Sequence, residues 1–104
     1  MTTYTQQEKL IINIARNLPK EWNKAHELIG NGATFIGYEV TARLSELEQD
    51  YPEMIEGRRE GKYRTRRLRV ELAREWLPSL PESVKEIVKK ELLRVNVPLN
   101  LNEL

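Results

Sequence analysis

The sequence contains no cysteine, which excludes disulfides and thiolate metal sites. No apolar run approaches the ~20 residues that a membrane-spanning helix requires. The N-terminal residues Met1–Thr5 lack a basic segment followed by an apolar run, so they predict no secretory signal. We therefore expect a soluble, cytoplasmic protein without contact to a membrane.

Residue types that carry catalysis are also scarce. His26 is the only histidine, no nucleophile-elbow motif accompanies it, and no glycine-rich phosphate loop is present. Glu60-Gly61-Lys62 has the acid-x-Lys spacing of metal-dependent nucleases, but it falls on a predicted hairpin tip without an acidic partner on a preceding strand. We expect no enzyme activity, no cofactor, no metal site and no small-molecule ligand.

The basic residues, by contrast, are concentrated in one segment. The chain has 104 residues and a formal net charge of +1, yet residues 58–69 hold seven basic side chains and one acid. The other residues hold ten basic and fifteen acidic side chains, a sum of −5. A nearly neutral protein thus keeps most of its positive field in one short stretch, which favours contact with a polyanion.

Three helices are predicted before this basic segment. Thr5 and Glu8 have the spacing of a capping box, and helical periodicity predicts a first helix over 5–18, ended by Pro19. A second helix is expected over 20–29, with Trp22 as a core aromatic. The third is expected over 36–50; its apolar stripe consists of Ile36, Val40, Leu44 and Leu47.

A β-hairpin and further helices are predicted after them. Residues 54–59 and 62–68 flank a glycine-containing turn, which indicates a hairpin. Both faces of its strands carry arginine, so the hairpin is expected to be solvated or bound to acidic groups. Helical spacing returns over 68–77, with Trp76 in the core, and a last helix begins near Glu82. Its apolar stripe, Val84, Ile87, Val88, Leu92 and Val95, packs either on the first helix or in a homodimer.

Residues 37–48 have the pattern Val-Thr-x-x-Leu-x-x-Leu, carried here by Val40-Thr41, Leu44 and Leu47. This stretch resembles the recognition helix of the winged helix-turn-helix superfamily, and the small members from bacteriophages and mobile elements are the most similar. The resemblance implies a mainly α fold with a small β-hairpin, divided into a winged domain over 1–70 and a C-terminal helical extension over 71–104. It implies a recognition helix over 36–50 and a basic wing over 54–69.

The resemblance further implies a regulator, of transcription or of a mobile element, that binds double-stranded DNA. Cations displace counterions from phosphates, and side chains near the start of a recognition helix reach base edges. The expected nucleic-acid-binding residues are Tyr38, Thr41, Ala42, Arg43, Ser45, Arg58, Arg59, Lys62, Tyr63, Arg64, Arg66 and Arg67.

Two alternatives remain open from the residues. The third helix is acidic, since Arg43 stands against Glu39, Glu46, Glu48 and Asp50. Phosphates would repel such a helix, so a protein-interaction module on the same scaffold is one alternative. An RNA-duplex binder, whose arginines follow backbone shape, is the other.

Overall fold

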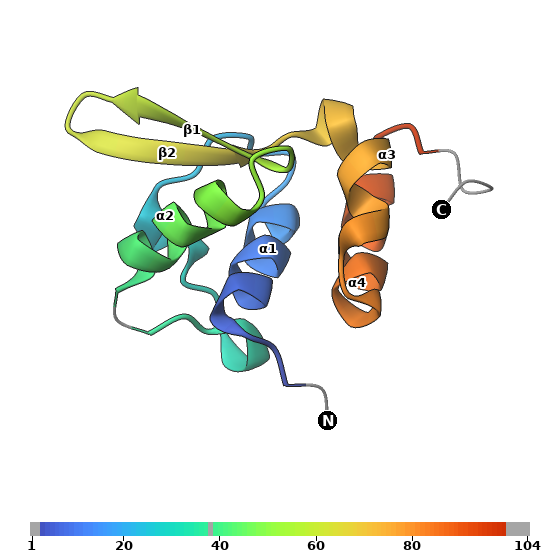
Figure 1. Cartoon of the computed structure of the whole chain (residues 1–104), viewed down its shortest axis with the longest axis horizontal. Coiled ribbons are helices and arrows are strands. Elements are labelled where there is room, and N and C mark those ends of the chain that lie inside the picture. Colours follow the sequence, from blue (N-terminus) through green and yellow to red (C-terminus); the bar gives the residue numbers. More distant parts are fainter. Residues whose placement is uncertain (1–2, 38, 100–104) are drawn as a thin grey trace.

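The computed structural model describes residues 3–37 and 39–99 (Figure 1). It is mostly helical and carries a two-stranded antiparallel hairpin. The α-helices and strands are α1 (Gln6–Arg16), α2 (Val40–Asp50), β1 (Ile55–Glu60), β2 (Tyr63–Leu68), α3 (Ala73–Trp76) and α4 (Glu82–Arg94). Short 3₁₀ turns connect them: η1 (Ala25–Leu28), η2 (Gly32–Thr34), η3 (Val70–Leu72) and η4 (Leu77–Ser79).

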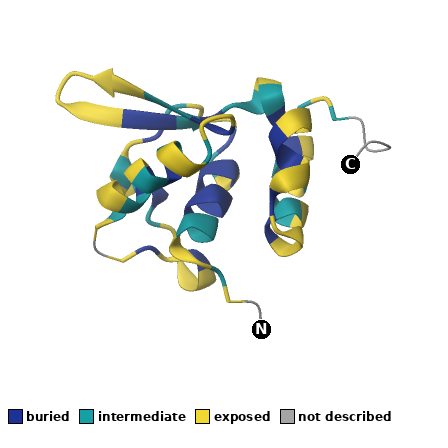
Figure 2. Cartoon of the chain, in the orientation of Figure 1, coloured by how far each residue is buried: buried dark blue, intermediate teal, exposed yellow. Residues whose placement is uncertain are grey.

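Helix α1 lies at the centre of the molecule, between α2 and α4 (Figures 1 and 2). The predicted capping box is confirmed: the Glu8 amide donates to Thr5 Oγ1 at 3.1 Å, and the Thr5 amide donates to Glu8 Oε1 at 2.8 Å. Every residue from Leu10 to Ala15 is buried, so this helix supplies the middle of the core.

The prediction of a helix over 20–29 was wrong. Only η1 is helical there, and Asn23 instead forms an isolated antiparallel bridge with Arg66 of β2. The Asn23 amide donates to the Arg66 carbonyl at 2.9 Å, and the Arg66 amide donates to the Asn23 carbonyl at 3.0 Å. Of the apolar residues predicted for this helix only Leu28 is fully buried, and the backbone bonds to the hairpin replace helical ones.

The segment after this bridge is fastened to α1 by the buried side chain of Asn13. Its Nδ2 donates to the carbonyls of Leu28, at 3.0 Å, and Thr34, at 2.8 Å. Gly30, at φ +77°, passes so close that an added Cβ would collide with this amide group. The polar side chain thereby fixes η1, which forms one wall of the candidate site described below.

Helix α2 begins at Val40, four residues later than predicted. Glu39 precedes it in the left-handed conformation, with φ of 67°, and Ile36 lies outside any helix or strand. The predicted stripe still faces inward, since Ile36, Leu44 and Leu47 are buried and Val40 is partly buried.

The predicted hairpin is confirmed, with β1 paired to β2 from Ile55–Leu68 at its base to Glu60–Tyr63 at its tip. The base is buried and the tip is exposed (Figure 2). Alternation places Gly57, Arg59, Arg64 and Arg66 on one face with the core pair Ile55 and Leu68.

The C-terminal part packs on the rest of the described chain. Its buried residues, among them Trp76 as predicted, belong to the same core cluster as those of α1 and α2. The helix predicted over 68–77 is wrong in extent, because Leu68 ends β2 and only the short pieces η3, α3 and η4 follow.

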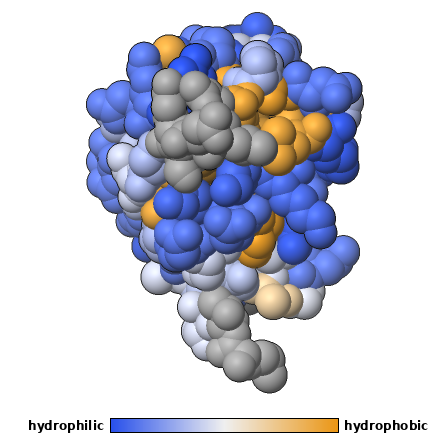
Figure 3. Space-filling model, turned by 90° about the vertical axis from the view of Figure 1, so that its right-hand side faces the viewer, coloured by the Kyte–Doolittle hydropathy of each residue, from blue (hydrophilic) through white to orange (hydrophobic). Residues whose placement is uncertain are grey.

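Most of the apolar stripe of α4 packs within the described chain. Val84, Val88 and Leu92 are buried, and the Arg94 guanidinium donates to the Leu18 carbonyl at 2.8 Å, where α1 has ended. These three residues of the stripe therefore pack toward α1, whereas Ile87 and Val95 are only partly buried, and a homodimer stays a prediction. Seen from the side of α4, the remaining surface is largely hydrophilic with hydrophobic patches (Figure 3).

The clamp by Asn13 is testable. We expect Asn13→Ala to lower the free energy of unfolding by about 2 kcal/mol, because two buried carbonyls lose their donor. Gln6→Ala, an exposed change on the same helix, should stay within about 0.5 kcal/mol of the wild type. Urea denaturation measures both; equal effects of the two changes would contradict the clamp.

Candidate nucleic-acid interface

Arg66 is the most buried cation of the basic segment, with 2% of its surface exposed. Its Nε lies 2.8 Å from Glu48 Oε2 on α2, and its Nη2 lies 3.4 Å from Ser45 Oγ. Glu48 also pairs with Arg64, whose Nη2 lies 2.7 Å from Oε1. One carboxylate of the acidic helix thus pairs with two arginines of the hairpin and offsets one of their two charges.

Burial opposes the ionisation of Glu48, but hydrogen bonds from Arg64 and Arg66 outweigh it and hold the pKa of this carboxyl below its ordinary value of 4.5. Gly57 makes the arrangement sterically feasible. An added Cβ there would collide with the Glu48 carboxylate and lie 2.7 Å from Arg64 Nη2. The absence of a side chain on β1 leaves the space in which this carboxylate sits.

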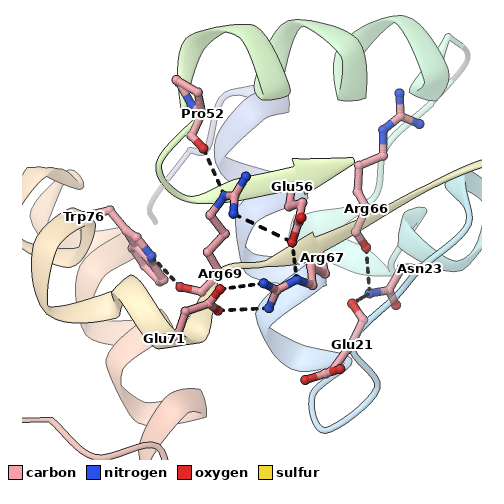
Figure 4. A network of polar contacts seen from close by, with 9 residues as sticks. All are labelled: Glu21, Asn23, Pro52, Glu56, Arg66, Arg67, Arg69, Glu71 and Trp76. Atoms are coloured by element: carbon pink, nitrogen blue, oxygen red, sulfur yellow. Dashed lines mark hydrogen bonds and ion pairs between the residues drawn. The ribbon is translucent and has the colours of Figure 1, made fainter. Parts of the chain in front are cut away.

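A second group of arginines is paired at the base of the hairpin (Figure 4). Arg67 bonds to Glu56 at 2.5 Å and, through two nitrogens, to Glu71 at 2.9 and 2.5 Å. Arg69 lies 3.8 Å from Glu56 and donates to the Pro52 carbonyl at 3.2 Å. The bonds from Arg67 lower the pKa of Glu71. These arginines join the hairpin to the segment before α3.

Trp22 stacks with a third arginine. The Arg58 guanidinium lies 3.9 Å from the centre of the indole ring and 3.5 Å from Glu60 Oε1. Trp22 is only partly buried, so its prediction as a core aromatic was wrong. Its ring covers the hairpin face opposite to Arg66 and lies against cations rather than against the apolar core.

The outward side of α2 carries little positive charge. Thr41, Ala42 and Ser45 are exposed, as a recognition helix would require. Arg43, however, lies 2.9 Å from Glu46 and 3.6 Å from Glu39, so its charge is offset within the helix. Tyr38, the remaining predicted contact of this helix, lies outside the described residues.

A groove of about 420 Å³ lies between η1, the start of α2 and the tip of β2. We call it the basic groove. No acidic residue is among the described residues that line it. Those residues are Lys24, Ala25, His26, Ile29, Val40, Thr41, Lys62, Tyr63, Arg64 and Arg66.

The basic groove brings together five of the predicted site residues: Thr41, Lys62, Tyr63, Arg64 and Arg66. Sequence reasoning missed its second wall, formed by Lys24, His26 and Ile29. The bridge between Asn23 and Arg66 places this wall beside the hairpin, and no local pattern encodes such a long-range pair. Arg59 is exposed near the tip and forms no ion pair within residues 3–37 and 39–99.

Comparisons with known proteins add no identification: no family model, curated protein or solved structure matches this chain. Within the described ranges, no cluster of histidine and acidic side chains is placed to hold a metal ion. No helix in the same ranges is long and apolar enough to cross a membrane.

The role of Glu48 gives a pH-dependent prediction. At pH 7 we expect Glu48→Gln to lower the free energy of unfolding by about 3 kcal/mol, because Arg66 stays buried without its counterion. A lowered folded-state pKa contributes stability above pH 4.5, which is lost as the pH falls through the folded value. The wild type should therefore approach the variant below pH 4.5.

Chemical denaturation at a series of pH values tests this expectation. Glu46→Gln, which removes the exposed partner of Arg43, is the matched control and should change stability by less than about 1 kcal/mol. A difference between wild type and Glu48→Gln that stays constant down to pH 2.5 would show that the ion pair is not the source of the stability.

Proposed function

We propose that this protein is a DNA-binding regulator that contacts double-stranded DNA through the basic groove and the adjacent hairpin tip. The observation that carries the proposal is the composition of the groove. Lys24, Lys62, Arg64 and Arg66 line it without an acid among the described lining residues. Such a surface attracts phosphates and gains entropy by the release of condensed counterions.

The contributions of these cations differ. Arg66 and Arg64 are paired with Glu48, so these two arginines hold the hairpin against α2 and thereby shape the groove. They also contribute to the positive electrostatic potential inside it. Lys24 and Lys62 form no ion pair in the described part of the chain; Lys24 directly precedes η1, Lys62 lies at the hairpin tip, and both ammonium groups lie near the Tyr63 ring. We infer that these two lysines make the main phosphate contacts, with Arg59 at the tip as a third.

We propose a winged helix-turn-helix fold together with this function, and the order of the elements supports it. The order α1, η1, α2 and hairpin follows that pattern, and the bridge at Asn23 adds a third strand-like segment beside β2. The second helix of the pattern is reduced to the 3₁₀ turn η1. Thr41 lies both in the groove and on the exposed side of α2, so the two surfaces are continuous.

One observation favours a second candidate, a protein-interaction module. The outward charges of α2 sum to −1 over Arg43, Glu39 and Glu46, which does not suit deep insertion into a DNA groove. In the DNA-binding proposal this helix lies beside the backbone, and the lysines of the groove supply the affinity.

The test is a titration of a fluorescent mixed-sequence duplex at several salt concentrations. We expect Lys24→Ala/Lys62→Ala to weaken binding about tenfold and to lower the salt slope by about 2, because two phosphate contacts are lost. Lys89→Ala/Lys90→Ala on α4 removes the same charge at the other end of the molecule and should leave both quantities unchanged (Figure 1).

Two results would oppose the proposal. Equal weakening by both double variants would mean that net charge alone drives association. No binding by the wild type at low salt would exclude duplex DNA as the partner and leave the protein-interaction candidate. An RNA duplex of the same sequence, titrated in parallel, separates the two nucleic acids.

A further inference from the structure

The proposed phosphate contacts involve only some of the residues that line the basic groove. Ala25, Ile29 and Val40 also line it, and all three are partly buried, whereas the lysines and Tyr63 are exposed. The groove therefore has a floor of these aliphatic side chains beside the buried Arg66, beneath a rim of exposed cations. A backbone phosphate would bind the rim and leave the apolar floor exposed to water. Its binding would therefore gain no free energy from burial of apolar surface.

Tyr63 stands at the rim, and 52% of its surface is exposed. The Lys24 ammonium lies 5.0 Å from the ring centre and the Lys62 ammonium lies 5.8 Å from it. An exposed aromatic residue with two cations beside its ring resembles the surfaces on which bases of single-stranded nucleic acids stack while their phosphates meet cations.

The size of the groove agrees with a ligand larger than a phosphate group. Its volume of about 420 Å³ lies within the range of small-molecule sites, roughly 300–1,000 Å³. Bases within a duplex are stacked on their neighbours and cannot reach an aliphatic floor. An unpaired base can leave the stack and present both an apolar face and an attached phosphate.

We propose that the basic groove holds one unpaired nucleotide of the bound DNA. Its base lies against Tyr63 and the aliphatic floor formed with Ile29 and Val40, and its phosphate lies between Lys24 and Lys62. This inference rests on the proposed function and specifies it further: the preferred partner is a duplex that carries a single-stranded extension or a gap.

The experiment compares three fluorescent probes by anisotropy: a blunt duplex, the same duplex with a three-nucleotide thymidine overhang, and that overhang with abasic residues in place of thymidine. The abasic probe keeps every phosphate and removes only the bases. For the wild type we expect affinity for the thymidine overhang to exceed that for the abasic one by about five- to a hundredfold.

Two variants assign the preference to the groove. Tyr63→Ala should bring the ratio between the thymidine and abasic probes close to one, and Tyr63→Phe should keep it, because the ring is retained. The measured quantity is the ratio of the affinities for the two overhang probes. A variant that binds both probes more weakly by the same factor leaves this ratio unchanged. Circular dichroism confirms that both variants fold.

The outcomes separate this inference from the proposed function. Equal affinity of the wild type for the thymidine and abasic overhangs, with the blunt duplex still bound, overturns the inference alone. Binding of the thymidine overhang without binding of the blunt duplex supports contact with unpaired nucleotides and overturns the proposed contact with double-stranded DNA. Failure to bind any of the three probes overturns both.

Discussion

Buried Arg66 joins three parts of the described structure: the segment after α1, the hairpin and α2. Its backbone pairs with Asn23, which draws the segment after α1 against the hairpin, and its guanidinium pairs with Glu48, which holds α2 on the other side. A cation with only 2% of its surface exposed requires a partner, because an unpaired buried charge would cost several kcal/mol. The positions of η1, α2 and the hairpin tip, and hence the basic groove between them, follow from this constraint.

Ion pairing also gives the arginine-rich segment a different role in the fold from the one that its charge in the sequence indicates. In the sequence it is a short region of strong positive charge, but in the fold Glu48, Glu56 and Glu71 neutralise much of it. The groove cations that form no ion pair in the described residues are lysines: Lys62 at the hairpin tip and Lys24 next to η1. Arginine here serves mainly as a structural cation, consistent with its capacity to form several fixed hydrogen bonds at once.

Local patterns predicted the elements that local forces determine. The capping box at Thr5, the stripe of Leu44 and Leu47 and the two strands of the hairpin are all confirmed, since each depends on residues a few positions apart. The segment from residue 20 to 29 was misjudged because its backbone bonds go to Arg66, about forty residues away. For the same reason the wall of the basic groove next to η1 could not be predicted from the sequence. The wall formed by the hairpin was predicted.

We propose that the two lysines of the basic groove meet nucleic acid, and that the paired arginines at the hairpin base do not. Amide chemical-shift mapping during titration with a DNA duplex tests this most directly. We predict that the largest shifts occur at residues 24–26, at Thr41 and at residues 62–64, with little change at residues 67–71. Shifts centred on residues 67–71 or on α4 would contradict the account.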